Sequence, residues 1–193
     1  MSGVLLNEVR SRLCALGFKS QGQNNIRRSL PGGVDVAVHF HQMEGSRVSP
    51  TVSFGALKYA KIAGKKLKSN FGFEIEVENI SFYGFSLNKF MNQYFSYYNN
   101  YLDLYCIERS SDVQIFCDAF YDSEFSKIFH CAGLIDAVRA VSGGVFSSGG
   151  GYMFLASMVV AEIGCSELRN ELYQYADKYG SELEKGFLQE FVP

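Results

Sequence analysis

Two histidines on one predicted strand are the first residues whose types could do chemistry. His39 and His41 are two positions apart, so their side chains point to the same face of a strand, where two imidazoles can hold one metal ion. Zinc needs a third and usually a fourth ligand, which Glu74, Glu76 or Glu78 could supply from a neighbouring predicted strand. The alternative is that both histidines lie on the solvated face of the sheet. The sequence favours this alternative, and we expect no metal.

Nucleophilic catalysis requires a serine or cysteine beside a base, and the sequence offers one local pair, His130 and Cys131. Neighbouring residues of a helix point roughly 100° apart, so these two would not form a dyad. The glycine-rich segment 143–151 precedes a predicted helix and could offer backbone N–H groups to an anion. It lacks both the Gly-Lys-Ser/Thr ending of a P-loop and the spacing of a dinucleotide-binding loop, so we expect a surface loop. No catalytic residue and no cofactor are predicted.

Acidic and aromatic residues between positions 101 and 124 are candidates for binding a partner protein. They are Asp112, Asp118, Asp122, Glu124, Tyr121 and Tyr101. Asp118 and Asp122 would lie one turn apart on a helix, where like charges are slightly destabilising. A basic partner would explain such a pair, and tyrosines are common anchors at protein interfaces. The alternative is a plain solvated helix face.

The charge is unevenly distributed along the chain. Residues 1–70 contain 11 Lys and Arg against 3 Asp and Glu, a net charge of +8, whereas residues 71–193 contain 7 against 17, a net charge of −10. The asymmetry favours electrostatic steering of a charged partner, unless the two signs interleave in the folded protein. A sequence pI near 5.9 is lower than the basic pI typical of nucleic-acid-binding domains, so we expect no direct contact with nucleic acid.

Composition bounds the class of protein. A chain of 193 residues with 47% hydrophobic and 20% charged residues fits one folded domain and excludes wholesale disorder. Five widely spaced cysteines without a Cys-x-x-Cys pair argue against a disulfide framework and against a zinc knuckle. No apolar run is long enough to span a bilayer, and the N-terminus lacks the order of a secretory signal. We therefore expect a cytoplasmic protein that does not contact a membrane.

Periodicity predicts the elements that position these residues in the first half of the chain. Leucine and valine at helical spacing predict a helix over residues 3–16. Apolar and polar residues then alternate in four segments, which predicts strands over residues 26–30, 34–40, 48–56 and 73–77. The lysine-rich residues 58–69 are expected to form a solvated connection, in which one or two helical turns remain open. Short turns between the strands predict an antiparallel sheet with one buried face.

The second half of the sequence has helical periodicity. Helices are predicted from Ser86 to residue 105 and over residues 152–163, where an apolar run indicates a buried helix. A last helix is predicted over residues 166–191, with a bend at Gly180 and an apolar stripe that includes Tyr175 and Tyr179. Residues 112–130 suit a helix better than a strand, although both remain open. The predicted fold is α+β, with an N-terminal helix, a four-stranded antiparallel sheet and a helical C-terminal half packed on it. We expect a single domain over residues 1–193, with helix and sheet in 1–84 and a mainly helical part in 85–193.

The N-terminal pattern resembles small bacterial domains of unknown function, some of which are similar to immunity proteins of contact-dependent and polymorphic toxin systems. The resemblance rests on the helix, Leu16-Gly17-Phe18-Lys19, Gly22, Ile26-Arg27-Arg28 and the strand bearing Val36, Val38 and Phe40. It covers residues 5–57, and the C-terminal helices match more loosely. Immunity proteins bind a toxin encoded beside them, so the resemblance implies a toxin partner and no catalytic residue.

The expected function is therefore toxin inhibition. An immunity protein with acidic and aromatic residues could mask the basic, phosphate-binding cleft of a nuclease. The expected partner is a cognate toxin with a basic nuclease domain, and the expected contact residues are the six named above. Two alternatives remain: a metal- or small-ligand-binding domain that uses the histidine face of the sheet, and a regulatory protein-interaction module.

Overall fold

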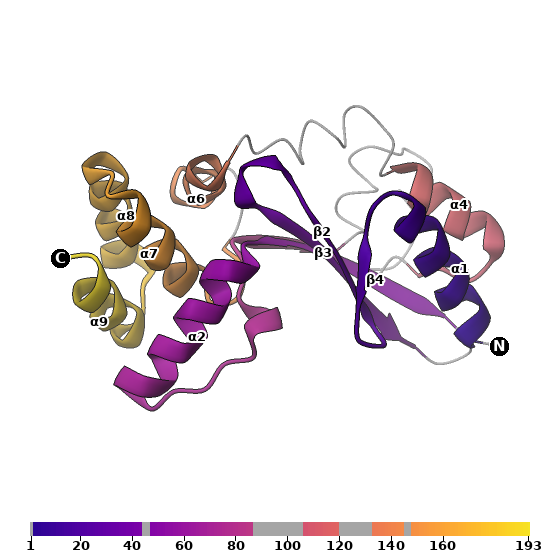
Figure 1. Cartoon of the computed structure of the whole chain (residues 1–193), viewed down its shortest axis with the longest axis horizontal. Helices are drawn as coiled ribbons and strands as arrows, with labels where there is room; N and C mark the ends of the chain where they lie inside the picture. Colours follow the sequence, from indigo (N-terminus) through magenta and orange to yellow (C-terminus); the bar gives the residue numbers. More distant parts are fainter. Residues whose placement is uncertain (1, 44–46, 87–105, 120–132, 145–147) are drawn as a thin grey trace. The chain divides into compact units, whose positions relative to one another are not determined.

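The predicted α+β class is confirmed by a computed structural model, which describes residues 2–43, 47–86, 106–119, 133–144 and 148–193. Figure 1 shows its elements. The helices of the described residues are α1 (Ser2–Ala15), α2 (Leu57–Phe71), α4 (Ser110–Ala119), α6 (Leu134–Ser142), α7 (Tyr152–Ile163), α8 (Ser166–Tyr179) and α9 (Glu182–Phe191). The strands are β1 (Lys19–Gln21), β2 (Asn25–Ser29), β3 (Asp35–Gln42), β4 (Val48–Gly55) and β5 (Tyr83–Ser86). Short 3-10 turns span Pro31–Gly33 and Val77–Asn79.

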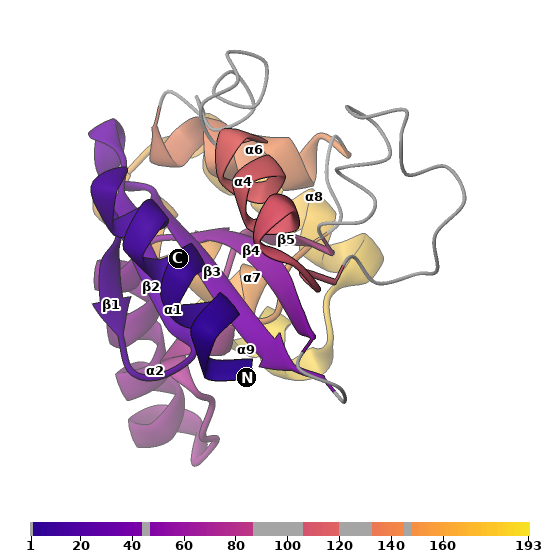
Figure 2. The same ribbon diagram turned by 90° about the vertical axis from the view of Figure 1, so that its right-hand side faces the viewer.

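The five strands form one antiparallel sheet in the order β1-β2-β3-β4-β5, and Figure 2 shows them in this order from left to right. The predicted strands over residues 26–30, 34–40 and 48–56 are confirmed within one or two residues at each end. On β3, Val36, Val38 and Phe40 are buried while His39 is half-buried and His41 is exposed, as the alternation predicted. Apolar residues at every second position of β3 therefore lie on one face of the strand, and this face is buried.

The predicted strand over residues 73–77 is wrong. Gly72 ends α2 with a left-handed φ of 64°, and the chain then forms a 3-10 turn over Val77–Asn79. A Cβ built at Gly64 would lie 3.5 Å from Val77 Cγ2, so this side of the segment packs against α2. The alternation of apolar and polar residues over 73–77 thus reflects a segment that packs one of its sides against α2. Glu74, Glu76 and Glu78 are exposed on it and belong to no strand.

The lysine-rich residues 58–69 also differ from the prediction, because they form most of the helix α2. Its buried residues are Tyr59, Ala60, Ala63 and Leu67. Ala56 precedes the helix and offers no side-chain cap, but the buried carboxylate of Asp35 accepts a hydrogen bond of 2.7 Å from the backbone N–H of Leu57. A local sequence pattern predicts a helix cap from the residues that directly precede the helix. A cap that comes from a strand distant in the sequence therefore cannot be predicted in this way.

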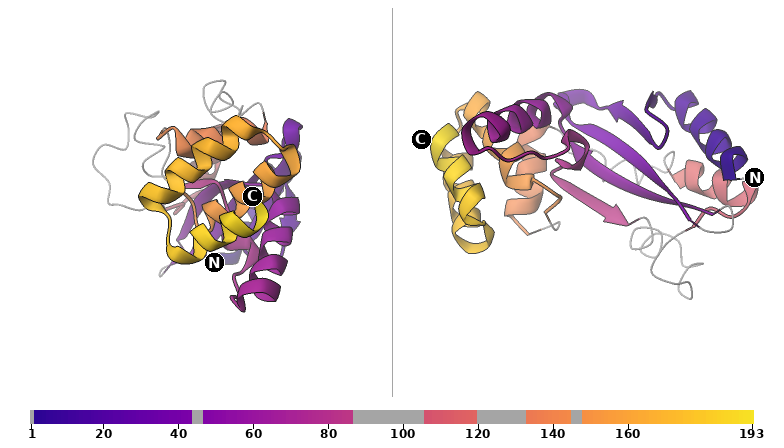
Figure 3. Two further views of the ribbon diagram at one scale, coloured as in Figure 1. Left: turned by 90° about the vertical axis from the view of Figure 1, so that its left-hand side faces the viewer. Right: turned by 90° about the horizontal axis from the view of Figure 1, so that it is seen from below.

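The chain divides into two compact units, each assembled from separate stretches of sequence. Unit 1 comprises residues 1–30, 36–53 and 85–131, and unit 2 comprises residues 31–35, 54–84 and 132–193. In unit 1, α1 and α4 lie side by side (Figures 1 and 3). Phe40 of β3 and Phe116 of α4 are both buried, with ring centroids 6.5 Å apart. The prediction of a single domain stays a prediction.

The core of unit 2 is built around α7. Every residue of this helix from Tyr152 to Val160 is buried, as the apolar run predicted, and α2, α8 and α9 pack against it (Figure 3). The predicted helix over residues 166–191 is in fact two helices. Gly180 adopts an extended conformation, and Ser181 begins α9 with a capping box in which its side chain and that of Glu184 exchange hydrogen bonds with the backbone. No described helix combines the length and apolar character needed to cross a membrane.

Candidate functional site

The predicted partner-binding residues fall into two groups. Asp112 and Asp118 lie on α4, which confirms a helix over the first part of the ambiguous segment 112–130. The other four, Tyr101, Tyr121, Asp122 and Glu124, lie outside the described residues. The predicted helix from Ser86 to residue 105 also lies outside them, except for Ser86, which is the last residue of β5. The structure therefore describes α4 and its surroundings as the candidate partner site.

Asp112 stabilises the start of α4. Its Oδ2 accepts hydrogen bonds from the backbone N–H groups of Glu108, at 3.0 Å, and Arg109, at 2.9 Å. These donors precede the helix and have no partner within it, and a carboxylate in the first turn also interacts favourably with the helix dipole. The carboxylate of Asp112 thus has a structural role at the start of α4. Its replacement would change the helix as well as any interface.

Asp118 is exposed at the other end of α4 and belongs to a row of polar side chains across two helices. The amide of Gln114 donates a 2.6 Å hydrogen bond to Asp118, and the guanidinium of Arg12 on α1 donates to the oxygen of that amide. Arg12 also contacts Glu8 at 3.3 Å. The row Glu8–Arg12–Gln114–Asp118 therefore limits the orientations available to the terminal carboxylate.

An exposed apolar side chain lies beside this row. Ile115 on α4 is 36% exposed, and the helical spacing of three residues places it on the same side of the helix as Asp118. The hydroxyl of Ser110 donates to Glu8 at 2.9 Å and links the same two helices a second time. We refer to this surface as the α1–α4 face, defined by Glu8, Arg12, Gln114, Ile115 and Asp118. It combines an exposed apolar side chain with oriented polar groups.

The two histidines of β3 interact with each other and with neighbouring polar groups. Their ring centroids are 4.4 Å apart, His39 Nδ1 contacts Asn25 Oδ1, and His41 Nε2 lies 3.4 Å from Thr51 Oγ1. The described residues contain no group of three His, Cys, Asp or Glu side chains placed to hold a metal ion. Glu74, the proposed third ligand, is on no strand and forms an ion pair with Lys68. Among the described residues, the geometry therefore gives no support to the less favoured hypothesis of a metal site at these histidines.

Burial, and secondly the charge on His41, lowers the pKa of His39 from its usual value of 6.5. The folded protein then binds this proton less readily than the unfolded chain, so the free energy of unfolding decreases as the pH falls through 6.5. We expect His39→Gln to lose less stability than the wild type between about pH 7 and pH 5. Urea unfolding of both proteins at each pH measures this difference, and identical pH dependences would contradict it.

The described cysteines are Cys14, Cys106, Cys117 and Cys165, and all four are free thiols. Burial raises the pKa of Cys117 to about 11, so this group is a protonated thiol at neutral pH. The thiolate is the nucleophilic form of cysteine. Cys117 therefore serves as a small apolar residue in the core of unit 1.

The glycine-rich segment before α7 packs tightly against another part of unit 2. The N–H of Gly149 donates to the carbonyl of Phe82 at 2.8 Å, and the N–H of Ser81 donates to the carbonyl of Gly150, also at 2.8 Å. A Cβ at Gly149 would lie 2.3 Å from Ser81 Oγ, and one at Gly150 would lie 2.7 Å from the carbonyl oxygen of Asn79. Gly149 and Gly150 are therefore required because two backbone segments approach each other closely here. This packing accounts for the two glycines, and a role in binding an anion is not needed to explain them.

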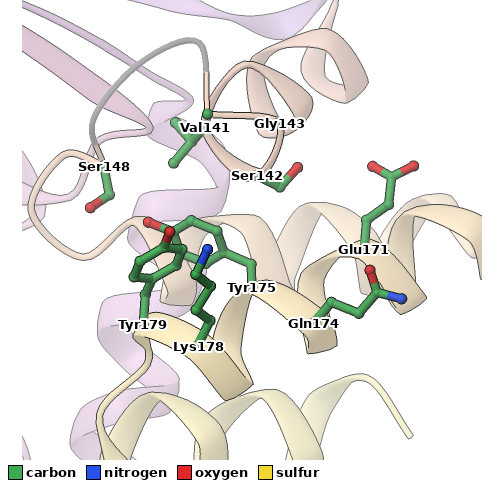
Figure 4. A pocket seen from close by; sticks show the side chains of 10 residues that line it. Val141, Ser142, Gly143, Ser148, Glu171, Gln174, Tyr175, Lys178 and Tyr179 are labelled. Carbon is green, nitrogen blue, oxygen red and sulfur yellow. The ribbon is translucent and has the colours of Figure 1, made fainter.

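A pocket of about 750 Å³ lies within unit 2, between one side of α8 and the C-terminal end of α6. Figure 4 shows the side chains of Lys178 and Tyr179 rising from α8 into the space below Ser142 and Ser148. The α8 residues that line it are Glu171, Gln174, Tyr175, Lys178 and Tyr179. Their spacing of three and four residues is visible in the sequence, where it assigns Tyr175 and Tyr179 to an apolar stripe. The pocket is therefore not predicted by the sequence.

The described residues thus offer an acidic and apolar face on unit 1 and a polar, tyrosine-lined pocket on unit 2. The α1–α4 face has the composition of a protein interface, and the pocket has the size of a small-molecule site. Neither the sequence nor the structure matches a known protein family, a curated protein or a solved structure.

Proposed function

We propose that this protein is a cytoplasmic immunity protein that binds a cognate bacterial toxin of the nuclease class and neutralises it by masking its active site. The observation that carries the proposal is the oriented carboxylate of Asp118 beside the exposed Ile115 on the α1–α4 face. The proposal also draws on the resemblance of residues 5–57 to small bacterial domains, some of which are similar to immunity proteins, and on the net charge of −10 after residue 70.

Charge complementarity is the physical basis of the proposed inhibition. A nuclease binds phosphates with basic residues, and a partner that presents carboxylates competes for the same groups. Helix α4 contains two aspartates and no Lys or Arg between Ser110 and Ala119. The row that ends at Asp118 orients its carboxylate before binding, so less side-chain freedom is lost when the complex forms. An oriented carboxylate therefore supports binding to a basic cleft.

The sequence directly after α4 contains further acidic and aromatic residues. Tyr121, Asp122 and Glu124 follow Ala119 within five positions and add one aromatic and two acidic side chains. Together with Tyr101 they complete the proposed contact set, in which Asp112 stabilises the helix that presents Asp118. A regulatory module with another basic partner would use the same face, and only the effect on a toxin distinguishes the two functions.

The proposal predicts a specific loss of affinity for the toxin encoded beside this gene. Asp118→Ala should weaken the complex about tenfold or more, because an interfacial charge pair that loses one partner leaves the other unpaired. Asp177→Ala is the matched control, since Asp177 is an exposed aspartate on α8 of unit 2, and it should leave affinity unchanged. Surface plasmon resonance with the purified toxin measures both variants.

Salt provides a second reading of the same experiment. Raising the ionic strength should slow association with the toxin, because the attraction between opposite charges is screened beyond a distance of about 8–10 Å. Charge reversal of Lys61 and Lys65 on α2 should leave association with the toxin unchanged if the acidic face is the binding surface. If Asp118→Ala binds as tightly as the wild type and salt has no effect, the electrostatic mechanism is wrong. Absence of any complex would refute the proposed function.

A further inference from the structure

The pocket on unit 2 has a fixed aromatic wall. The ring centroids of Tyr175 and Tyr179 are 5.0 Å apart, and Tyr175 meets the buried Tyr152 edge-to-face at 5.2 Å. The hydroxyl of Tyr152 donates to the carbonyl of Val138 at 3.0 Å, which anchors this row of rings to α6. Tyr179 ends the row and is 61% exposed. An anchored row that ends in an exposed ring offers a surface on which a planar ligand can stack.

The acidic and basic side chains of the pocket lie at its two ends. At one end, Glu171 is held by Arg139 through contacts of 3.0–3.2 Å, and Arg139 also contacts Glu167 at 3.1 Å. At the other end, the ammonium of Lys178 lies 4.9 Å from the centroid of the Tyr179 ring. Among the described residues, no carboxylate forms an ion pair with Lys178. Within the part of the chain that the structure describes, the charge beside the exposed ring is therefore a cation without an acidic partner.

Neutral hydrogen-bonding groups also belong to the lining of the pocket. Ser142 donates its hydroxyl proton to the carbonyl of Val138 at 3.3 Å, which leaves lone pairs on its oxygen as acceptors. Ser148 and the amide of Gln174 are exposed and belong to the lining. A volume of about 750 Å³ lies within the range of pockets that accept small molecules. The lining thus provides a ring platform, a cation and several neutral polar groups.

We propose that this pocket binds a small molecule with a planar aromatic ring and one anionic group. The ring stacks on Tyr179 beside Tyr175, and the anion pairs with the ammonium of Lys178. Ser142, Ser148 and Gln174 contribute hydrogen bonds to polar substituents of the ligand. The pocket shares no residue with the α1–α4 face, so this proposal does not depend on the proposed toxin binding.

Three probes with one ring system test the proposal: anionic 2-naphthoate, neutral 2-naphthalenemethanol and cationic 2-naphthylmethylamine. Each is titrated into the full-length ¹⁵N-labelled protein while backbone and side-chain amide signals are followed by NMR. We expect saturable shifts at Gly143, Gly144 and the Gln174 side chain, with 2-naphthoate binding about threefold more tightly than the alcohol because of its ion pair. Binding of the amine should be weakest.

Two variants separate the roles of the ring and the cation. Tyr179→Ala should weaken all three probes about fivefold or more, because it removes the stacking surface. Lys178→Met should reduce the affinity of 2-naphthoate to that of the neutral alcohol and leave the alcohol unaffected. Phe73→Ala, which removes a 43% exposed ring elsewhere in unit 2, and Lys65→Met on α2 are the matched controls and should have no effect.

Several results would overturn the proposal. Shifts that do not saturate, or that lie away from the pocket, would show that the ring does not bind there. An unchanged affinity of Tyr179→Ala would exclude stacking on this ring, and an unchanged preference for 2-naphthoate in Lys178→Met would exclude the ion pair. The altered side chains are both exposed, so the variants should keep the circular dichroism spectrum and melting temperature of the wild type.

Discussion

Replacing Phe187 by alanine is expected to lower the free energy of unfolding by about 3–5 kcal/mol. Its side chain is fully buried on α9, with ring centroids 5.1 Å from Phe154 on α7 and 5.8 Å from Phe71 on α2. A third ring, that of Phe191, lies at 4.7 Å. The truncation therefore removes the residue that joins three helices of unit 2 and leaves a cavity among aromatic rings.

Urea unfolding followed by circular dichroism measures this loss. A typical domain has only about 5–15 kcal/mol of stability, so the variant should unfold at a much lower urea concentration than the wild type. Phe73→Ala is the control, because this ring is 43% exposed and its removal should cost less than about 1 kcal/mol. Equal losses in the two variants would mean that α9 does not pack as described.

The second large effect is expected at Gly149, where a methyl group has no room. Gly149→Ala should lower the free energy of unfolding by about 1–3 kcal/mol, the usual cost of forcing extra volume into a packed site. The added Cβ would lie 2.3 Å from Ser81 Oγ, 3.0 Å from the Ser81 carbonyl oxygen and 3.1 Å from Tyr83 Cα. Two of these three atoms belong to the backbone, so a change of side-chain rotamer alone cannot relieve the contact.

Gly3→Ala is the matched control for this substitution. Gly3 lies in α1, and a Cβ there would have no atom within 4 Å. Alanine is a better helix former than glycine, so this change should leave stability unaffected or raise it by about 0.5–1 kcal/mol. Thermal unfolding of both variants gives the comparison. If Gly149→Ala is as stable as the wild type, the tight approach of segment 148–151 to residues 79–83 is incorrect.

Elements with a simple period could be predicted from the sequence. The alternation on β3 indicated the buried face of Val36, Val38 and Phe40, and the apolar run of α7 indicated a helix that is buried along most of its length. On β3 one repeating face contacts the core, so the period of the apolar residues reports the geometry of the backbone. Helix α7 is instead buried at nine consecutive residues, and the length of its apolar run indicated the element. The fold class followed from the order of these elements.

Elements that depend on distant partners were mispredicted. Residues 73–77 alternate because one side packs on α2, and a strand would have produced the same pattern. Helix α2 was missed because its lysines suggested a solvated connection and its cap comes from Asp35 on β3. The break between α8 and α9 was signalled locally by Ser181 and Glu184, a capping-box spacing that the long apolar stripe obscured.

The candidate sites were only partly accessible to sequence reasoning. Composition pointed to Asp112 and Asp118, but the different uses of their carboxylates follow from hydrogen bonds to Glu108, Arg109 and Gln114. The pocket on unit 2 requires two elements far apart in the sequence, α6 and α8, to face each other. No periodic pattern within one element encodes such an approach.

The most direct test of the proposed function is a titration of the purified toxin's nuclease activity with this protein. The proposal predicts that activity falls linearly and is lost at one equivalent of protein, because binding masks the active site. Asp118→Ala should require a clear excess to reach the same inhibition, whereas Asp177→Ala should behave as the wild type. Full nuclease activity at saturating concentrations of the protein would contradict the proposed function.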